Sequence, residues 1–154
     1  MLELVIAMAV LAVLGALALP SLGARLDQQR LYSAAEALLA DLQEARFEAV
    51  RQGRPLHRVV QTGPAWCWAV AQQAACPCGQ AQPCELRSAR SQDHAGVQLL
   101  QAQALMLAPQ GLPSAAASQT LESRRGLQLR VDTQALGRAR ICTLRGPTVR
   151  YPAC

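Results

Sequence analysis

MLELVIAMAVLAVLGALALP, residues 1–20, decides the fold of this chain. Eighteen of these twenty residues are apolar or glycine, one is proline, and Glu3 is the only charged residue. The segment is apolar on all sides, whereas a helix that covers a soluble core needs only one apolar stripe. As a helix, residues 2–19 span about 27 Å, close to the roughly 30 Å hydrocarbon thickness of a bilayer. The segment is therefore predicted to be a transmembrane helix rather than a buried core helix.

A secretory signal peptide is the third interpretation of this segment. Signal peptides begin with a basic region and end at a cleavage site of small residues. Here no positive charge precedes the apolar run, and Pro20-Ser21 leads into a further helical pattern. Both features favour the transmembrane helix.

The helical pattern continues to Gly53, which with Pro55 forms a stop signal. Apolar residues recur at helical spacing on one stripe: Leu31, Ala35, Leu38, Leu39, Leu42, Ala45, Ala49 and Val50. The opposite face carries Asp27, Arg30, Ser33, Asp41, Glu44 and Glu48, and Arg46 interrupts the stripe. A coiled coil is one interpretation. A single stripe of alanine and leucine that ends at a Gly-Pro stop favours a helix packed on a sheet.

After residue 53 the pattern changes to the alternation typical of strands. We expect strands at 56–61, 66–72, 97–107, 126–132 and 138–144, and loops at 73–93 and 108–124. The predicted fold class is α+β, with a long N-terminal helix packed on a small antiparallel β-sheet domain. Residues 1–23 form the membrane-spanning first half of the helix, 24–53 its amphipathic second half, and 54–154 the β-rich domain.

The N-terminal segment resembles the first helix of type IV pilins and type II secretion pseudopilins. Glu3 takes the place of the family's glutamate, and Leu2, Leu4, Ala9, Leu11 and Pro20 follow the family motif in register. The sequence also resembles the FimT/GspH group of minor pilins in its long helix, its later strands and the Gly-Arg-Ala-Arg element at residues 137–140 near the C-terminus. Family members begin with a basic leader that prepilin peptidase removes, and the new terminus becomes N-methylated. Met1 lies two residues inside that start, so the resemblance implies an upstream leader.

Glu3 is an isolated carboxylate in an apolar segment. Such a group at membrane depth is costly and is normally paired or functional. The alternative is that Glu3, at the end of the span, extends its side chain to the membrane–water interface and has no function. The resemblance implies filament assembly, in which Glu3 meets the N-terminal amine of a neighbouring subunit. It also implies other pilin or pseudopilin subunits as partners, and an inner-membrane protein with a periplasmic domain that later enters a pilus or pseudopilus.

The chain has six cysteines, an even number in a domain expected outside the inner membrane, where disulfides persist. They are Cys67, Cys76, Cys78, Cys84, Cys142 and Cys154. Zinc binding is the alternative, but Cys-x-Cys is not the usual zinc spacing. We therefore expect disulfides and neither metal nor cofactor. Cys142 is expected to pair with Cys154, which closes the terminal segment onto the last strand, and Cys67 with a cysteine of the 76–84 loop.

Positive charge gathers at the C-terminus. All fifteen basic residues are arginine, and residues 121–154 carry seven of them against Glu122 and Asp132. On a strand, Arg138 and Arg140 point to one side about 6.6–7 Å apart, close to the phosphate repeat of a nucleic-acid strand. Arg130, Arg145 and Arg150 are candidates to extend this patch. In the FimT branch, which this sequence resembles, a Gly-Arg-x-Arg element is associated with DNA binding. The alternative is a solvated basic hairpin that binds nothing.

No catalytic motif is present: His57 and His94 lack an acid or serine at motif spacing, so an enzyme is not expected. Trp66 and Trp68, two apart on one strand, are interpreted as packing residues. Three functions compete. The first, favoured by the basic C-terminus, is a type IV minor pilin that binds DNA non-specifically in uptake and natural transformation. The second is a GspH-like minor pseudopilin of type II secretion with a structural role, and the third a generic minor pilin for assembly or adhesion.

Overall fold

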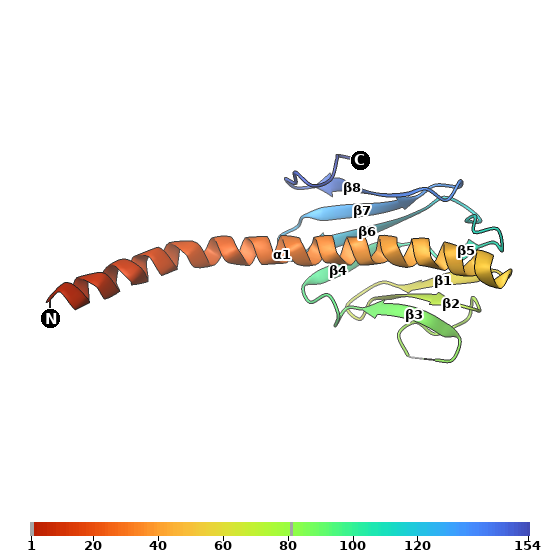
Figure 1. Ribbon diagram of the computed structural model, residues 1–154, viewed down its shortest axis with the longest axis horizontal. Coiled ribbons are helices and arrows are strands. Elements are labelled where there is room, and N and C mark those ends of the chain that lie inside the picture. The colour runs from red at the N-terminus through yellow and green to blue at the C-terminus, as the bar shows by residue number, and fades with distance from the viewer. Residues whose placement is uncertain (1, 81) are drawn as a thin grey trace.

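One long helix and two small antiparallel sheets make up the protein (Figure 1). The computed structural model describes residues 2–80 and 82–154. Its elements are α1 (Leu2–Gln52), β1 (Leu56–Gln61), β2 (Cys67–Ala71), β3 (Glu85–Arg90), β4 (Val97–Ala102), β5 (Leu105–Leu107), β6 (Ala117–Ser123), β7 (Gln128–Thr133) and β8 (Ala139–Arg145). The predicted α+β class, a long N-terminal helix on an antiparallel sheet domain, is confirmed.

The strands form two sheets, with strand orders β3-β2-β1-β5 and β4-β6-β7-β8. The second half of α1 runs along the domain in roughly the direction of the strands, between β6, β7 and β8 on one side and β1, β2 and β3 on the other, whereas the first half extends beyond the domain (Figure 1). Every residue that the structure describes as a buried part of the hydrophobic core lies at Leu31 or later. A fragment that begins at residue 24 therefore retains this whole core.

The apolar stripe of α1 faces the sheets as predicted for most of its length. Six of its eight members are buried: Leu31, Ala35, Leu38, Leu42, Ala45 and Ala49. Leu39 is half-buried against the core, and Val50 is wrongly placed in the stripe because it lies exposed beside the loop at Gly111. The helix ends at the predicted stop, where Gly53 has a φ of 61° and its amide donates to the Val50 carbonyl.

Residues 1–23 are predicted to span a membrane, and the length and hydropathy of the helices bear on that prediction. Across the residues that the structure describes, no helix combines the length and hydropathy needed to cross a membrane.

One strand prediction and two loop predictions were wrong. The segment 97–107 is two strands in different sheets, since the chain leaves β4 after Ala102 and enters β5 at Leu105. β3 lies inside the predicted loop 73–93, because an edge strand with one buried side chain, Ala89, has no clear alternation. β6 lies inside the predicted loop 108–124, because this central strand buries polar side chains such as Gln119 and Thr120.

A buried arginine joins the two sheets. Arg58 of β1 is 2% exposed and donates from Nη1 to Gln119 Oε1 of β6 (3.0 Å) and from Nη2 to the Gln103 carbonyl (2.8 Å). Burial lowers the pKa of Arg58 to about 10, so it stays charged at neutral pH. These bonds explain why Gln119 is buried in the middle of a sheet, since a buried amide needs a partner.

Arg46 links α1 to two loops. Its Nε donates to the Gly111 carbonyl at 2.9 Å, and its Nη1 donates to the Gly137 carbonyl in the turn between β7 and β8. Gly137 has a φ of 78°, and a Cβ there would lie 2.6 Å from Arg46 Cζ. The arginine that interrupts the apolar stripe therefore holds the tip of the β7–β8 hairpin.

All six cysteines pair, with no free thiol: Cys67 with Cys78, Cys76 with Cys84, and Cys142 with Cys154. The first two disulfides hold the loop between β2 and β3. The third holds the C-terminal tail against β8, where the Thr143 amide donates to the Pro152 carbonyl and the Cys154 amide to the Thr143 carbonyl. The expected pairing of Cys142 with Cys154 is the one found.

Gly137→Ala is expected to destabilise the domain more than Gly126→Ala. Both glycines have φ near +79°, but only Gly137 lacks room for a Cβ. The unfavourable φ costs about 1–2 kcal/mol at either position, whereas displacement of Arg46 adds roughly another 1–2 kcal/mol at Gly137 from lost hydrogen bonds to a charged group. Urea unfolding of residues 24–154 measures both. Equal losses of unfolding free energy in the two variants would contradict the role of Arg46 in holding the tip of the β7–β8 hairpin.

Peptide mapping without reduction should recover three cross-linked pairs from residues 24–154 made in the periplasm, with no free thiols. Replacing both Cys142 and Cys154 with serine should lower the free energy of unfolding by about 2–3 kcal/mol, because the bond closes a short loop. Stoichiometric zinc on protein with free thiols would overturn this assignment.

Candidate nucleic-acid interface

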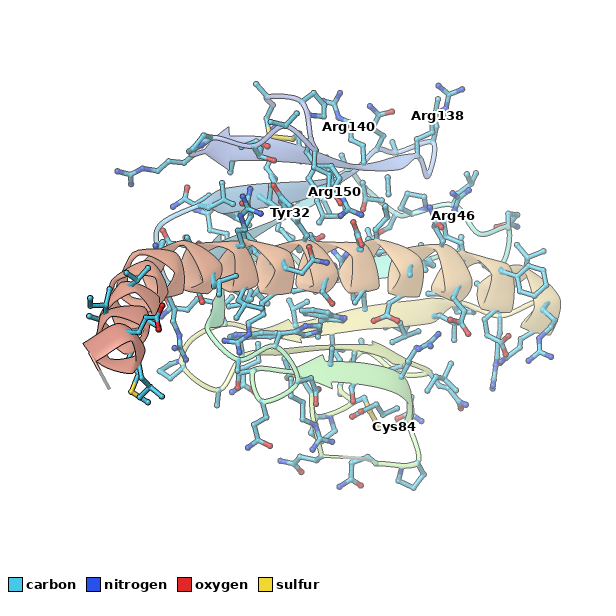
Figure 2. All side chains as sticks on the ribbon, turned by 60° about the vertical axis from the view of Figure 1, so that its left-hand side comes forward. Tyr32, Arg46, Cys84, Arg138, Arg140 and Arg150 are labelled. Carbon is cyan, nitrogen blue, oxygen red and sulfur yellow. A yellow bond between two sulfur atoms is a disulfide. The ribbon has the colours of Figure 1, made fainter. Side chains whose placement is uncertain are left out.

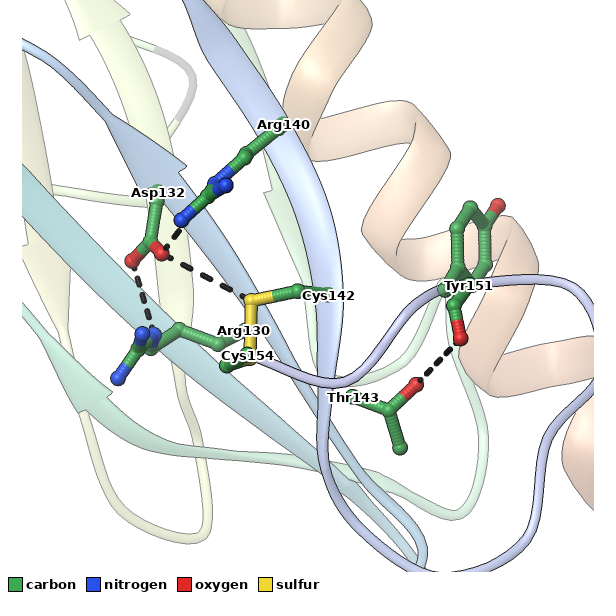
Figure 3. The surroundings of a disulfide bond; sticks show 7 residues. All are labelled: Arg130, Asp132, Arg140, Cys142, Thr143, Tyr151 and Cys154. Carbon is green, nitrogen blue, oxygen red and sulfur yellow. Dashed lines mark hydrogen bonds and ion pairs between the residues drawn. A yellow bond between two sulfur atoms is a disulfide. The ribbon is translucent and has the colours of Figure 1, made fainter.

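The β7–β8 hairpin places three of the predicted arginines on the outer face of its sheet. In β7, Leu129 and Val131 point into the core, so Arg130 and Asp132 point outward. Asp132 lies opposite Arg140 in the register of the two strands, and Arg130 lies opposite Cys142. Strand pairing therefore gathers Arg130, Asp132 and Arg140 around the Cys142–Cys154 disulfide (Figure 3).

Asp132 lies between two of these arginines. Its Oδ1 is 2.9 Å from Arg130 Nε, and its Oδ2 is 4.0 Å from Arg140 Nε and 3.7 Å from Cys142 Sγ (Figure 3). The Arg130 side chain is 31% exposed and the Arg140 side chain 61%. The carboxylate thus neutralises part of the charge, and Arg140 keeps most of its surface in solvent.

Arg138 lies at the hairpin tip, just before β8, and is exposed. Figure 2 shows its side chain directed away from the domain, with Arg140 on the same outer side and Arg46 at the helix. Gly137, which begins the Gly-Arg-Ala-Arg element, is held by Arg46 as described above. Arg138 and Arg140 are therefore presented by a fixed turn.

Arg150 lies elsewhere, against α1. Its Nη2 is 2.7 Å from Glu36 Oε1, and its guanidinium lies 5.5 Å from the ring centre of Tyr32 and 5.9 Å from that of Tyr151. These contacts fix the C-terminal tail on the helix. Arg150 does not join the outer face of β7 and β8.

Tyr151 completes this contact of the tail with α1, which sequence reasoning missed. Its hydroxyl donates to Glu36 Oε1, and its ring meets that of Tyr32 edge to face at 5.4 Å. Burial and then the hydrogen bond to Glu36 raise the pKa of Tyr151 to about 12. The hydroxyl therefore stays protonated and keeps donating at neutral pH.

Arg145 lies at the far end of β8 from Arg138, beside a groove formed with the β6–β7 turn and α1. The five arginines predicted as one patch thus occupy three places. Arg130, Arg138 and Arg140 share the outer face, Arg150 lies on the helix, and Arg145 lies at the end where the helix leaves the domain.

The tryptophans are packing residues, as interpreted from their spacing. Trp66 and Trp68 are both 1% exposed, and their rings stack at 5.0 Å. The indole Nε1 of Trp66 donates to the Val97 carbonyl, and that of Trp68 to Asp41 Oδ2. His94 stacks beside both rings, and burial lowers the pKa of its imidazole.

Two further features bear on chemistry. Glu3 lies exposed in the first turn of α1, next to exposed Leu4. Within residues 2–80 and 82–154, no group of three or more histidine, cysteine, aspartate or glutamate side chains is arranged to hold a metal ion.

Solved structures with this fold come from two filament systems. The type IV minor pilin FimU of Pseudomonas aeruginosa PAO1 is 20% identical, with a TM-score of 0.59 over 81% of this chain and 94% of that one. The minor pseudopilin EpsH from the type 2 secretion system of Vibrio cholerae is 17% identical, with a TM-score of 0.56 over 74% of this chain and 97% of that one. At these identities the likeness shows the fold alone.

A family assignment comes from the sequence. No curated protein is a significant match, but the family described as Type II transport protein GspH matches residues 34–137. The match takes in most of the buried half of α1 and all strands from β1 to β7, which is more than half of the chain. The chain therefore belongs to the GspH family of minor pilins and pseudopilins.

Proposed function

We propose that this GspH-family subunit is a minor pilin of a type IV pilus that binds DNA non-specifically through Arg138 and Arg140, in DNA uptake and natural transformation. The observation that carries the proposal is the exposure of these two arginines on the outer side of one hairpin. Arg140 lies in β8 and Arg138 directly before it, and in extended chain residues two apart repeat at about 6.6–7 Å, close to the spacing of phosphates along one nucleic-acid strand. Guanidinium groups bind phosphate through two hydrogen bonds.

The hairpin has the properties expected of a sequence-independent phosphate contact. The backbone that carries Arg138 and Arg140 is ordered by the pairing of β8 with β7 and by the hydrogen bond of Arg46 to Gly137. A backbone that is already ordered loses less conformational entropy when the hairpin binds. Arg130 supplies a third positive charge beside Asp132, so three arginines face one carboxylate in this cluster.

The N-terminal half of α1 is proposed to serve as membrane anchor and then as the filament-forming element. Apart from Glu3, the exposed side chains described in residues 3–10 are apolar, and Leu4, Ile6, Met8 and Val10 are each more than half exposed. A large exposed apolar surface of this kind marks a site of contact with a membrane or with another protein. We assign Glu3 to the pairing with a neighbouring subunit and prepilin peptidase to the removal of the leader.

A structural minor pseudopilin of a type II secretion system is the second candidate. One observation favours it: the carboxylate of Asp132 already engages Arg130 and Arg140, which lowers the positive charge that the hairpin offers to DNA. In that case the hairpin is a solvated or subunit-facing surface, and the domain contributes only to assembly.

Replacing both Arg138 and Arg140 with glutamine should weaken binding to double-stranded DNA and its dependence on salt. The slope of log affinity against log salt should fall by roughly 1.8, since each phosphate contact contributes about 0.9. Fluorescence anisotropy with residues 24–154 and DNA of mixed sequence measures this slope at several salt concentrations.

The matched control replaces with glutamine Arg51, in the last turn of α1, and Arg54, just after the helix, both of which are exposed. It removes the same charge and should leave the slope within error of the wild type. If the hairpin variant binds as well as wild type at every salt concentration, or the control loses as much, the DNA site is wrong and the structural pseudopilin is favoured.

Asp132→Asn should act in the opposite direction. Loss of the carboxylate frees Arg130 and Arg140, so affinity for DNA should rise several-fold at low salt, and the gain should shrink as salt screens it. Glu122→Gln is the control, because it removes a carboxylate from the same sheet that pairs with Gln128 instead of an arginine. Weaker DNA binding by Asp132→Asn, or an equal gain in Glu122→Gln, would contradict the role assigned to Asp132.

A further inference from the structure

A groove opens at the end of the domain where α1 leaves it, on the side of the apolar half of the helix. We call this the proximal groove; its volume is about 320 Å³. Three segments line it: residues 24–28 of α1, the β6–β7 turn and the turn after β8. The lining residues are Ala24, Asp27, Gln28, Ser123, Arg125, Gly126, Leu127, Arg145, Gly146 and Pro147.

Arg125 reaches from the β6–β7 turn to the helix. Its Nε lies 3.4 Å from Asp27 Oδ2, and its side chain is 55% exposed. A Cβ at Gly23 would lie 3.5 Å from Arg125 Nη2. Asp27 thus orients a guanidinium that extends along α1 toward the N-terminal half and still faces solvent.

Arg145 and Arg125 line the same groove, where two turns pack closely. Gly146 has a φ of 95°, and a Cβ there would lie 2.8 Å from Leu127 Cδ1. Only glycine allows the chain after β8 to approach the β6–β7 turn so closely. The groove is therefore a built feature with two arginines on its wall.

The groove itself carries a net positive charge. Its lining residues include two arginines, Arg125 and Arg145, and one carboxylate, Asp27. Asp27 pairs with Arg125. Among the lining residues the charge of Arg145 is therefore not balanced, and Arg145 lies at the opposite end of β8 from Arg138.

We propose that the proximal groove binds the phosphate of an anionic phospholipid headgroup while the subunit lies in the membrane. The inference rests on the membrane anchor proposed above. If the span ends near Leu19, four more residues bring the helix to Gly23, about 6 Å beyond the hydrocarbon. That height falls within the headgroup layer, which adds roughly 5–8 Å on each side of a bilayer.

Charge complementarity selects the occupant. Arg125 is directed to the level of Gly23, where a phosphate layer lies beneath the domain, and paired guanidinium groups bind phosphate well. An arginine near an anionic surface shifts binding by about fivefold. DNA would have to enter between domain and membrane to reach the same groove, whereas the hairpin of β7 and β8 is open.

The test uses the full chain in nanodiscs of phosphatidylcholine, alone or with about one-third phosphatidylglycerol. Hydrogen exchange of peptides that cover residues 123–127 and 145–147 should slow by about fivefold in the anionic nanodiscs, and salt near 1 M should remove the difference. The Arg125→Gln/Arg145→Gln variant should lose this protection with the rest of its exchange pattern unchanged. Arg138→Gln/Arg140→Gln, which changes the same charge, should keep it.

Equal exchange in the two lipids would overturn the headgroup site, as would protection that survives in the Arg125→Gln/Arg145→Gln variant. If that variant instead loses DNA affinity as strongly as the hairpin variant, the groove is a nucleic-acid site. Failure of the chain to insert into nanodiscs would overturn the anchor and the headgroup site together. Insertion without protection would overturn the site alone.

Discussion

Burial of one face of α1, from Leu31 to Ala49, is the constraint on which the rest of the structure depends. The two sheets are separate hydrogen-bonded units, and the helix runs along both of them (Figure 1). Each fully buried leucine on this face contributes about 1.5–3 kcal/mol. Since the sheets are small, neither has enough apolar surface of its own, and the helix supplies the common core. The bonds of Arg58 to Gln119 and Gln103 then fix the sheets relative to each other.

The two halves of α1 therefore have different roles. Its second half is the core of the domain, and its first half carries an exposed apolar surface away from it. Arg46, Glu36 and Asp41 on the buried half reach the β7–β8 hairpin, the C-terminal tail and Trp68. The orientation of the domain on the helix is thus set at several points, so the hairpin and the proximal groove keep fixed positions relative to the N-terminal half.

Most of the architecture follows from sequence pattern, and most of the surface does not. The helix, its stop at Gly53 and its stripe are predictable because periodicity and a Gly-Pro signal act locally. β3 could not be predicted from the sequence because an edge strand needs little apolar surface. β6 could not be predicted because its buried Gln119 is stabilised by Arg58, a residue far away in sequence. The positive C-terminus is evident from composition. Its division among the hairpin, the helix contact of Arg150 and the groove at Arg145 depends on tertiary contacts that no local pattern encodes.

Assembly through the N-terminal half of α1 is the central claim, and the composition of sheared filaments tests it most directly. The protein, expressed from its complete gene in a strain that assembles the cognate filament, should appear in the filament fraction at low copy number. Glu3→Ala should remain in the membrane fraction while its β-rich domain keeps three disulfides and its unfolding midpoint. Absence of the wild-type protein from filaments, or equal incorporation of Glu3→Ala, would contradict the account.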